Sequence, residues 1–323
     1  MTLVKLIAAF FMVVWLSNGP VFAQAWPSKP VRFVVPYAAG GSGDVIGRLI
    51  GSKLTEGGWG QQVVLDNRPG AAGTIGVGIV ARSATDGYTF LLGDDGVVSI
   101  TPHIQKSLAY DPQKDFIPVV QLAVVEFVLT VHPSVAATSL AEFINLLKRE
   151  PGKYSYASAG IGGIHHLSME WFKQLAGVNI IHVPYKGSGQ ILPDVISGTI
   201  PITYTGLSQA MPHVRAGKLR ALAIGGPNRL DAAPGVPSLS ETFPGFNGTV
   251  AWNLFAPAGV SRDIVQRVNA DVNRVLRDPE VSGQLAARGL FPLGGTPERF
   301  AEKIRTDYAR WGKLISDIGV KAE

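Results

Sequence analysis

The chain has 323 residues, of which 46% are apolar and 16% are charged, and its formal net charge is +5. A disordered chain has the opposite balance, so the sequence predicts a folded protein of about two domains. Cysteine is absent, which excludes disulfides, thiolate metal sites, a cysteine nucleophile and a lipid anchor on cysteine. The basic residues are dispersed along the chain, so no nucleic-acid partner is expected.

The first residues have the pattern of an export signal. Lys5 precedes an apolar run from Leu6 to Leu16, which has the length of a signal-peptide core and is shorter than the ~20 residues that span a bilayer. Small residues beyond this run predict cleavage after Ala23. Residues 1–23 are therefore predicted to be a signal peptide, and the mature protein is expected to be soluble in the periplasm and not a lipoprotein. An uncleaved membrane anchor is the alternative.

The chain after Pro27 alternates between strand-like and helix-like segments. Helices are predicted from Asp44 onward and over residues 75–80. Strands are predicted at residues 31–35, 63–65 and 88–92. This alternation predicts a parallel sheet with helices on its faces.

A second alternating block follows a long extended segment at residues 116–131, which Pro118 breaks and which is predicted to cross between two lobes. Ser139 and Glu142 have the spacing of a capping box and predict a helix that ends at Arg149. Further strands are predicted at residues 154–157, 180–183, 200–205 and 219–224. Further helices are predicted at residues 163–176, 189–196 and 208–216.

The last part of the chain begins with residues 227–248, which are rich in proline and glycine and predict a long surface connection. Residues 250–256 are extended and predict a second crossing between the lobes. An apolar stripe predicts a helix over residues 262–276 that lies on a sheet. A final helix is predicted to begin at Thr296.

These elements predict two α/β lobes joined by two extended crossings. Lobe 1 is expected to contain residues 24–122 and 251–323, and lobe 2 is expected to contain residues 123–250. The cleft between two such lobes is a common place for a ligand.

Three glycine-rich junctions lie between a predicted strand and a predicted helix. Residues 36–44 open the first helix, where free backbone N–H groups favour an anion. The spacing of their glycines does not match the G-x-G-x-x-G pattern of a dinucleotide site. Residues 156–163 and 182–189 repeat the strand–loop–helix pattern in the second lobe. All three junctions are candidates for ligand contact.

The histidines and serines near these junctions do not follow a known catalytic or metal-binding pattern. His165 and His166 lie in one helical turn, but H-E-x-x-H is absent and no further ligands follow at metal spacing. Adjacent side chains on a helix point about 100° apart, so at most one of the two is expected to face the cleft. A G-x-S-x-G nucleophile motif is also absent. We therefore expect no catalytic residue, no metal and no cofactor.

Many short segments of the chain are similar, in order, to segments of one protein family. They include VPYAAGGSGDVIGR, DNRPGAAGTIGVG, DGYTFLLG, YASAGIGGIHHLSMEWFKQLAG, HVPYKGSG and ARGLFPLGGTPERFAEKI. These segments resemble the Bug family, also called TctC, which contains the substrate-binding proteins of tripartite tricarboxylate transporters. The resemblance covers essentially all of the mature chain.

This resemblance implies the periplasmic binding protein type II fold, with two Rossmann-like α/β lobes joined by a two-strand hinge. It implies a small carboxylate ligand in the cleft: a di- or tricarboxylate, an acidic amino acid or an aromatic acid. It also implies that the partner is the set of membrane subunits of a tripartite tricarboxylate transporter. A monomer is expected. An exported enzyme and a solute sensor that use the same cleft are the alternatives.

The family's ligand loops, matched to this sequence, fall on residues 37–44, 67–73, 158–166 and 185–188. The resemblance implies that ligand-contacting residues lie in these loops and in the strand near Ile202. They are Tyr37, Ala39, Gly40, Gly41, Ser42, Asp44, Gly70, Ala71, Gly73, Ser158, Gly160, Gly162, His165, Tyr185, Lys186, Tyr204 and Thr205.

The sequence departs from the family pattern at several positions. Gly43 stands where threonine is common. The strand near Ile202 usually ends with an acid, whereas residues 204–206 here are Tyr-Thr-Gly, which suits a more negative or bulkier ligand. Asp94 and Asp95 are unusual after the third strand. They are expected either to contact an amino or hydroxyl group or to be solvated.

The candidate junctions contain no arginine, and Arg48 and Arg68 lie only at their margins. A carboxylate held by these loops therefore needs other donors. We expect it to rest on the backbone N–H groups of residues 39–43 and 160–163, together with the hydroxyls of Ser42, Ser158 and Ser188, because helix N-termini and amide donors favour an anion.

Overall fold

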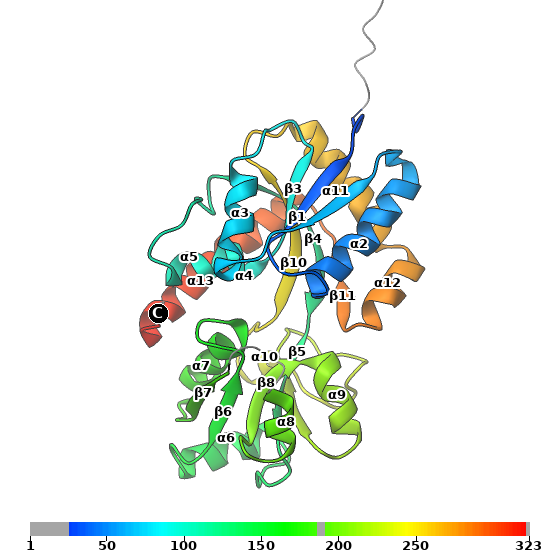
Figure 1. Ribbon diagram of the computed structural model, residues 1–323. Coiled ribbons are helices and arrows are strands. Elements are labelled where there is room, and N and C mark those ends of the chain that lie inside the picture. The colour runs from blue at the N-terminus through cyan, green and yellow to red at the C-terminus, as the bar shows by residue number, and fades with distance from the viewer. Residues whose placement is uncertain (1–25, 186–190, 321–323) are drawn as a thin grey trace, which may run out of the picture.

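The computed structural model describes residues 26–185 and 191–320. Within these ranges the chain forms two α/β lobes, each built around one sheet (Figure 1). The upper lobe in Figure 1 is lobe 1, and the lower lobe is lobe 2. The predicted fold class, two α/β lobes, is confirmed.

Lobe 1 begins with three parallel strands, as predicted. β1 (Val31–Val35) lies between β2 (Val63–Asn67) and β3 (Thr89–Asp94), with Phe33 opposite Phe90. β-Branched and aromatic residues favour these strands because they pack well on a pleated surface. Parallel strands bring their carboxyl ends to one edge of the sheet, and residues from these ends line the space between the lobes.

The rest of the lobe 1 sheet is antiparallel. β10 (Val250–Pro257) pairs with β3 on one side and with β4 (Phe116–Val125) on the other, and β11 (Leu290–Pro292) pairs with β4. The sheet order is therefore β11-β4-β10-β3-β1-β2. Pro118 was predicted to break the extended segment, but it lies within β4 opposite Phe255, beside a register shift. Such an irregularity accommodates a residue that lacks an N–H group.

Helices cover both faces of this sheet. They are α2 (Ser42–Leu54), α3 (Thr74–Ala81), α4 (Asp95–Ser99), α5 (Thr101–Ile104), α11 (Arg262–Leu276), α12 (Pro279–Ala286) and α13 (Pro297–Ile318), with single turns η1 (Thr55–Trp59) and η2 (Ala71–Gly73). α2, α11 and α12 pack on one face, and α3, α4 and α13 pack on the other. No helix in the described ranges is both long enough and apolar enough to span a bilayer.

The sequence predicted some of these helices and missed others. α11 has the bounds that its apolar stripe predicted, because five of its residues face the core at helical spacing. α4, α5, α12 and the strand β11 were not predicted. Each of them is short, and short elements carry too few periods for a pattern to appear.

Lobe 2 has the sheet order β7-β6-β8-β5-β9. Its strands are β5 (Phe127–Val131), β6 (Ser155–Ser158), β7 (Ile181–Pro184), β8 (Ile202–Gly206) and β9 (Arg220–Ile224). Its helices are α6 (Leu140–Arg149), α7 (Ile164–Ala176), α8 (Ile191–Ile196), α9 (Leu207–Arg215) and α10 (Leu239–Thr242). The Ser139 side chain caps α6 by accepting from the Glu142 N–H at 3.2 Å, whereas the Glu142 carboxylate accepts from Thr138.

Residues 227–248 are more than a surface connection, contrary to the prediction. They contain α10, which begins with a capping box formed by Ser238 and Glu241. Phe246 is buried and stacks on Trp171 with ring centroids 4.5 Å apart. The high proline and glycine content of this segment concealed its contribution to the lobe 2 core.

Two crossings join the lobes, as predicted. β4 ends at Val125 in the first sheet, Glu126 follows, and β5 begins at Phe127 in the second sheet. β10 returns the chain to lobe 1 and begins at Val250, which lies opposite Val125. These two crossings form the two-strand hinge (Figure 1).

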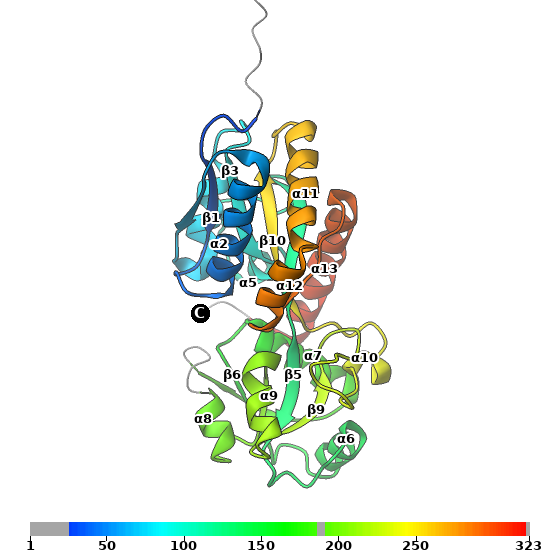
Figure 2. The same ribbon diagram turned by 90° about the vertical axis from the view of Figure 1, so that its right-hand side faces the viewer.

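The last helix makes a third contact between the lobes. α13 runs along lobe 1, and its C-terminal part packs against α7 of lobe 2 (Figure 2). Trp311 and Leu314 of α13 share a buried apolar cluster with Leu167 of α7. The ring of Trp311 also packs edge-on against Trp171, with centroids 5.8 Å apart.

Candidate ligand-binding cleft

Two adjoining cavities lie between the lobes. The first has a volume of about 290 Å³ and the second a volume of about 280 Å³. Both are lined by Asp94 of lobe 1, Ile164 of lobe 2 and Val250 at the start of the hinge strand β10. The two cavities are therefore parts of one interlobe cleft.

Three of the helices that begin at this cleft have a glycine as their N-cap. α2, α7 and α9 each follow a strand, and their N-caps are the glycines Gly41, Gly163 and Gly206. Gly163 and Gly206 line the cavities, as does Ser42, the first residue of α2. A glycine has no side chain to cap its helix, so the first N–H groups of α2 and α7 have no partner among the described residues. The first N–H of α9, that of Leu207, donates to the Glu126 carbonyl at 2.8 Å. Together with the positive ends of the helix dipoles, the unpartnered groups suit an anion.

Four of the residues predicted to contact a ligand line the cavities. Tyr37 and Ser42 come from lobe 1, and Gly162 and His165 come from lobe 2. The structure thus brings the junctions of the two lobes to the same cleft. Lys186 and Ser188 lie outside the described residues.

Other predicted residues lie in the same loops, outside the linings of these two cavities. They are Ala39, Gly40, Gly41, Gly70, Ala71, Gly73 and Gly160. Their neighbour Ala72 lines the first cavity. Gly160 has a φ of 134°, which only glycine adopts readily, so the loop before α7 needs this residue.

Two predicted polar side chains are held by other residues of the protein. Asp44 accepts a hydrogen bond from Arg48 Nε at 2.9 Å and another from the Gly40 N–H at 3.1 Å. The Arg48 guanidinium holds the pKa of Asp44 below its ordinary value. The Ser158 hydroxyl lies 2.6 Å from His182 Nε2. A direct contact of either side chain with a ligand stays a prediction.

Three further predicted side chains are also engaged within lobe 2. The hydroxyl of Tyr185 donates to Asp194 at 2.5 Å. The hydroxyl of Tyr204 donates to the carbonyl of Gly248 at 2.8 Å. Tyr204 and Thr205 are both buried in the sheet, so their ligand contacts also stay predictions.

The two adjacent histidines point in different directions, as helical geometry requires. His165 lines the second cavity and packs edge-on against Phe127, with ring centroids 5.1 Å apart. Burial lowers the pKa of His165 to about 4, so its ring is neutral at pH 7. His166 is buried in lobe 2, where its Nδ1 accepts a hydrogen bond from the Gly162 N–H at 3.1 Å. Among the described residues, no three His, Asp or Glu side chains lie close enough to share a metal ion.

The contact between Ser158 and His182 has the form of a nucleophile–base pair, but its surroundings do not suit catalysis. The Ser158 side chain is fully buried and lies outside the linings of both cavities. His182 stacks between Tyr156 and His166, with centroid distances of 4.9 and 4.1 Å. Burial lowers the pKa of His182 to about 4, which makes it a weak base. The pair packs lobe 2 instead of facing the cleft.

A sequence model described as the tripartite tricarboxylate transporter family receptor, TctC, matches residues 47–320. The chain belongs to this family. The resemblance seen in the sequence is thereby confirmed. TctC proteins are periplasmic solute-binding proteins. Protein BugT of Bordetella pertussis, a curated relative, is 32% identical over 323 residues and covers 99% of each chain.

Solved structures with the same fold include two that carry ligands. The structure described as R. palustris Rpa4515 with adipate is 34% identical, has a TM-score of 0.77, and covers 92% of this chain and 100% of that one. MatC from Rhodopseudomonas palustris with bound malate is 30% identical, has a TM-score of 0.72, and covers 90% of this chain and 100% of that one.

One departure from the TctC pattern has a steric explanation. A Cβ atom on Gly43 would lie 2.2 Å from the ring of Trp252, so the space that a threonine would need is occupied. Trp252 also packs edge-on against Tyr37, with ring centroids 5.6 Å apart. The glycine on α2 therefore admits an aromatic ring that supports a residue of the cleft wall.

Two charged residues of this TctC cleft were absent from the predicted site. Asp94 accepts a hydrogen bond from the Val97 N–H at 3.2 Å, and burial raises its pKa to about 6, an effect that the Tyr37 hydroxyl partly offsets. Arg288 follows α12 and donates to the Gln284 carbonyl at 2.7 Å. Asp94 was recognised as unusual but was not included in the site. No sequence pattern placed Arg288 near the cleft, because neither α12 nor β11 was predicted.

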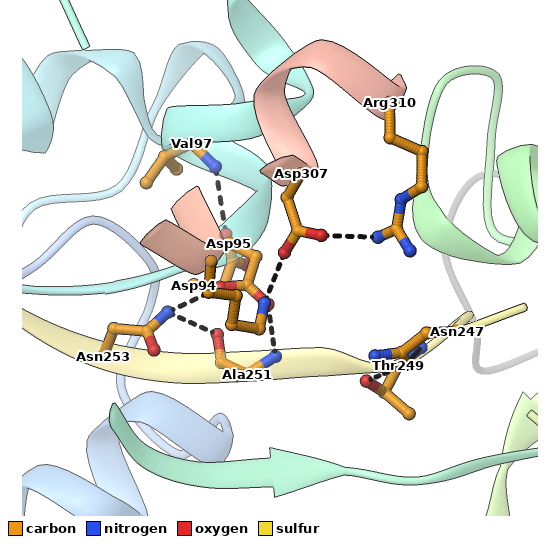
Figure 3. Close-up of polar contacts among 10 residues, drawn as sticks. Asp94, Asp95, Val97, Asn247, Thr249, Ala251, Asn253, Asp307 and Arg310 are labelled. Carbon is orange, nitrogen blue, oxygen red and sulfur yellow. Dashed lines mark hydrogen bonds and ion pairs between the residues drawn. The ribbon is translucent and has the colours of Figure 1, made fainter. Parts of the chain in front are cut away.

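The second residue of the acidic pair, Asp95, is buried, so the alternative of a solvated side chain is wrong for it. Its carboxylate accepts from the Ala251 N–H at 3.0 Å and from Asn253 Nδ2 at 2.9 Å (Figure 3). It also pairs with Lys303 Nζ at 3.1 Å, and Lys303 pairs in turn with Asp307. This network fixes the start of α4 to the hinge strand β10 and to α13.

The same network reaches lobe 2 through the end of α13. Asp307 pairs with Arg310 Nη2 at 2.8 Å (Figure 3). The Arg310 guanidinium lies 4.9 Å from the ring centre of Trp171 on α7. The cleft wall, the hinge strand and the contact between α13 and lobe 2 are thus physically connected.

Proposed function

We propose that this protein captures a small carboxylate in the interlobe cleft and passes it to the membrane subunits of a tripartite tricarboxylate transporter. The observation that carries the proposal is the convergence of the N-termini of α2, α7 and α9 on the cleft. A helix N-terminus stabilises an anion by about 0.3–1 kcal/mol at an exposed site and by up to ~2 kcal/mol when partly buried. The adipate and malate bound by two similar proteins support a carboxylate as the ligand class.

The proposal includes the cellular setting. Residues 1–23 direct export and are removed, and the mature chain acts in the periplasm as a monomer without a lipid anchor. A ligand that contacts both lobes favours their closed arrangement, because only that arrangement offers all of its contacts.

A thermal-shift screen tests the ligand class. Dicarboxylates, tricarboxylates, amino acids and aromatic acids are added singly to the purified mature chain. At least one of them is expected to raise the melting temperature, because a ligand that binds only the folded state stabilises it. A screen in which every compound leaves the melting temperature unchanged contradicts carboxylate binding.

The backbone N–H groups of residues 39–43 and 160–163 form the proposed carboxylate site, which we call the backbone cradle. A substitution that fills the space next to it tests this site. Gly41→Val is expected to abolish binding of the best ligand from the screen, because the added side chain blocks close approach to the N-terminus of α2. Gly41 has a φ of −76°, and a Cβ atom there would meet only the Ala38 carbonyl, at 3.7 Å, so the variant is expected to fold. Ser42→Ala is expected to weaken binding by no more than about tenfold, the effect of one hydrogen bond. Isothermal titration calorimetry measures the affinity of both variants for that ligand.

A matched control separates blocking of the cleft from general damage. Gly57 lies in η1, just beyond the C-terminal end of α2, and a Cβ atom there would meet nothing within 4 Å. Gly57→Val is therefore expected to bind like the parent protein. Normal binding by Gly41→Val, or complete loss of affinity through Arg68→Ala alone, contradicts a carboxylate held by backbone donors.

A further inference from the structure

Asp94 gives the cleft a negative group that capture of a simple carboxylate does not require. It is the only acidic residue among the described residues that line the two cavities, and it lines both. Its position at the end of β3 places it at the carboxyl edge of the parallel strands, where the ligand loops of lobe 1 also lie. A ligand that occupies either part of the cleft therefore lies next to Asp94.

Among the described residues, no lysine, arginine or histidine forms an ion pair with Asp94. The nearby Lys303 is engaged by Asp95 and Asp307 instead. Tyr37, which lines the first cavity beside Asp94, supplies only a neutral hydroxyl. Burial raises the pKa of Asp94 to about 6, so the carboxyl is mainly ionised at neutral pH although its surroundings disfavour the charge. A cation from a ligand would relieve this cost.

The rest of the cleft has the opposite polarity. The N-termini of α2, α7 and α9 favour an anion, and the second cavity adds the guanidinium of Arg288. A simple dicarboxylate can place one carboxylate there, but its other carboxylate then approaches the like charge of Asp94. A molecule that carries both an ammonium and a carboxylate avoids this repulsion.

We propose that Asp94 makes this cleft selective for amino carboxylates, with the ligand's ammonium paired to Asp94 and its carboxylate held at the helix N-termini. This inference rests on the proposed carboxylate-binding function and adds to it the charge pattern of the ligand. Asp94 is then the specificity-determining residue, and the backbone cradle supplies the affinity that all carboxylates share.

Calorimetry with pairs of probes that differ by one ammonium group tests the proposal. The pairs are glutarate and glutamate, adipate and 2-aminoadipate, and 4-methylpentanoate and leucine. In every pair of which a member binds, the amino acid is expected to bind at least tenfold more tightly than its deamino partner. Asp94→Asn is expected to reduce this preference to less than twofold. Asparagine caps a helix as well as aspartate does, so the variant keeps the start of α4.

Asp263→Asn is the matched control, because it removes one negative charge from an exposed position on α11 outside both cavities. It is expected to leave the preference unchanged. A parent protein that prefers the deamino acids, or an Asp94→Asn variant that keeps the preference for amino acids, overturns the inference while carboxylate capture stands. Absence of binding by all six probes and by every acid of the thermal-shift screen overturns the proposed function as well.

Discussion

Replacing Lys303 with methionine is expected to lower the free energy of unfolding by about 3–5 kcal/mol, the usual cost of removing one partner from a buried ion pair. Lys303 lies between Asp95 and Asp307, and both carboxylates are buried. Burial alone disfavours the ammonium, but the two carboxylates outweigh it and hold the pKa of Lys303 above its ordinary value. Methionine keeps an apolar stem of similar length, leaves the buried charge of Asp95 without a cation, and leaves Asp307 paired with Arg310 alone. Chemical denaturation at pH 7 measures the loss.

Lys313→Met provides the control on the same helix. Lys313 pairs with Asp317 at 2.7 Å, but its side chain is 77% exposed. Exposed ion pairs contribute about 0–1 kcal/mol, so this variant is expected to be nearly neutral. Adding Asp95→Asn to Lys303→Met is expected to restore part of the lost stability, because the unpaired charge of Asp95 is then gone. Equal losses from Lys303→Met and Lys313→Met would show that the buried network is not stabilising.

The parts of the fold that local pattern determines were predicted well from the sequence. The β-branched run of β1 and the apolar stripe of α11 each describe one element completely, because β1 is buried on both faces and α11 buries one face at helical spacing. The crossing from β4 to β5 was visible because residues 116–131 are almost continuously strand-like. The junctions before α2 and α7 were located at the cleft because a strand, small residues and a helix follow one another there.

The parts that depend on contacts distant in sequence were not predicted. Arg288 reaches the second cavity only because β11 pairs with β4, and a strand of three residues has too short a pattern to recognise. The need for Gly43 comes from Trp252, which lies about 200 residues further along the chain. The hydrogen bond from the Tyr204 hydroxyl to the Gly248 carbonyl likewise depends on a distant segment, residues 227–248, which the sequence predicted to be a surface connection.

The free energy of unfolding is expected to depend on pH because of one hinge residue, Glu126. This residue lies between β4 and β5, and only 7% of it is exposed. Within the described residues its Oε2 atom has no hydrogen-bond partner. Burial raises the pKa of Glu126 from 4.5 to about 7. The folded state therefore holds its proton more tightly than the unfolded chain. This contribution to stability is complete below pH 4.5 and is lost as the pH rises through 7.

Glu126→Gln is expected to remove this dependence, because glutamine does not ionise. The shift corresponds to about 3 kcal/mol in total, of which about 2–3 kcal/mol falls between pH 5 and pH 8. Asp94 and the buried histidines also titrate near this range, so the measurement is the difference between variant and parent unfolding free energies at pH 5 and pH 8. The amide of glutamine adds a cost that is the same at both pH values and cancels in that difference. Glu56→Gln, at an exposed position in η1, is expected to leave the parent's dependence intact. If Glu126→Gln also leaves it intact, the buried carboxyl is not the source of the hinge's pH sensitivity.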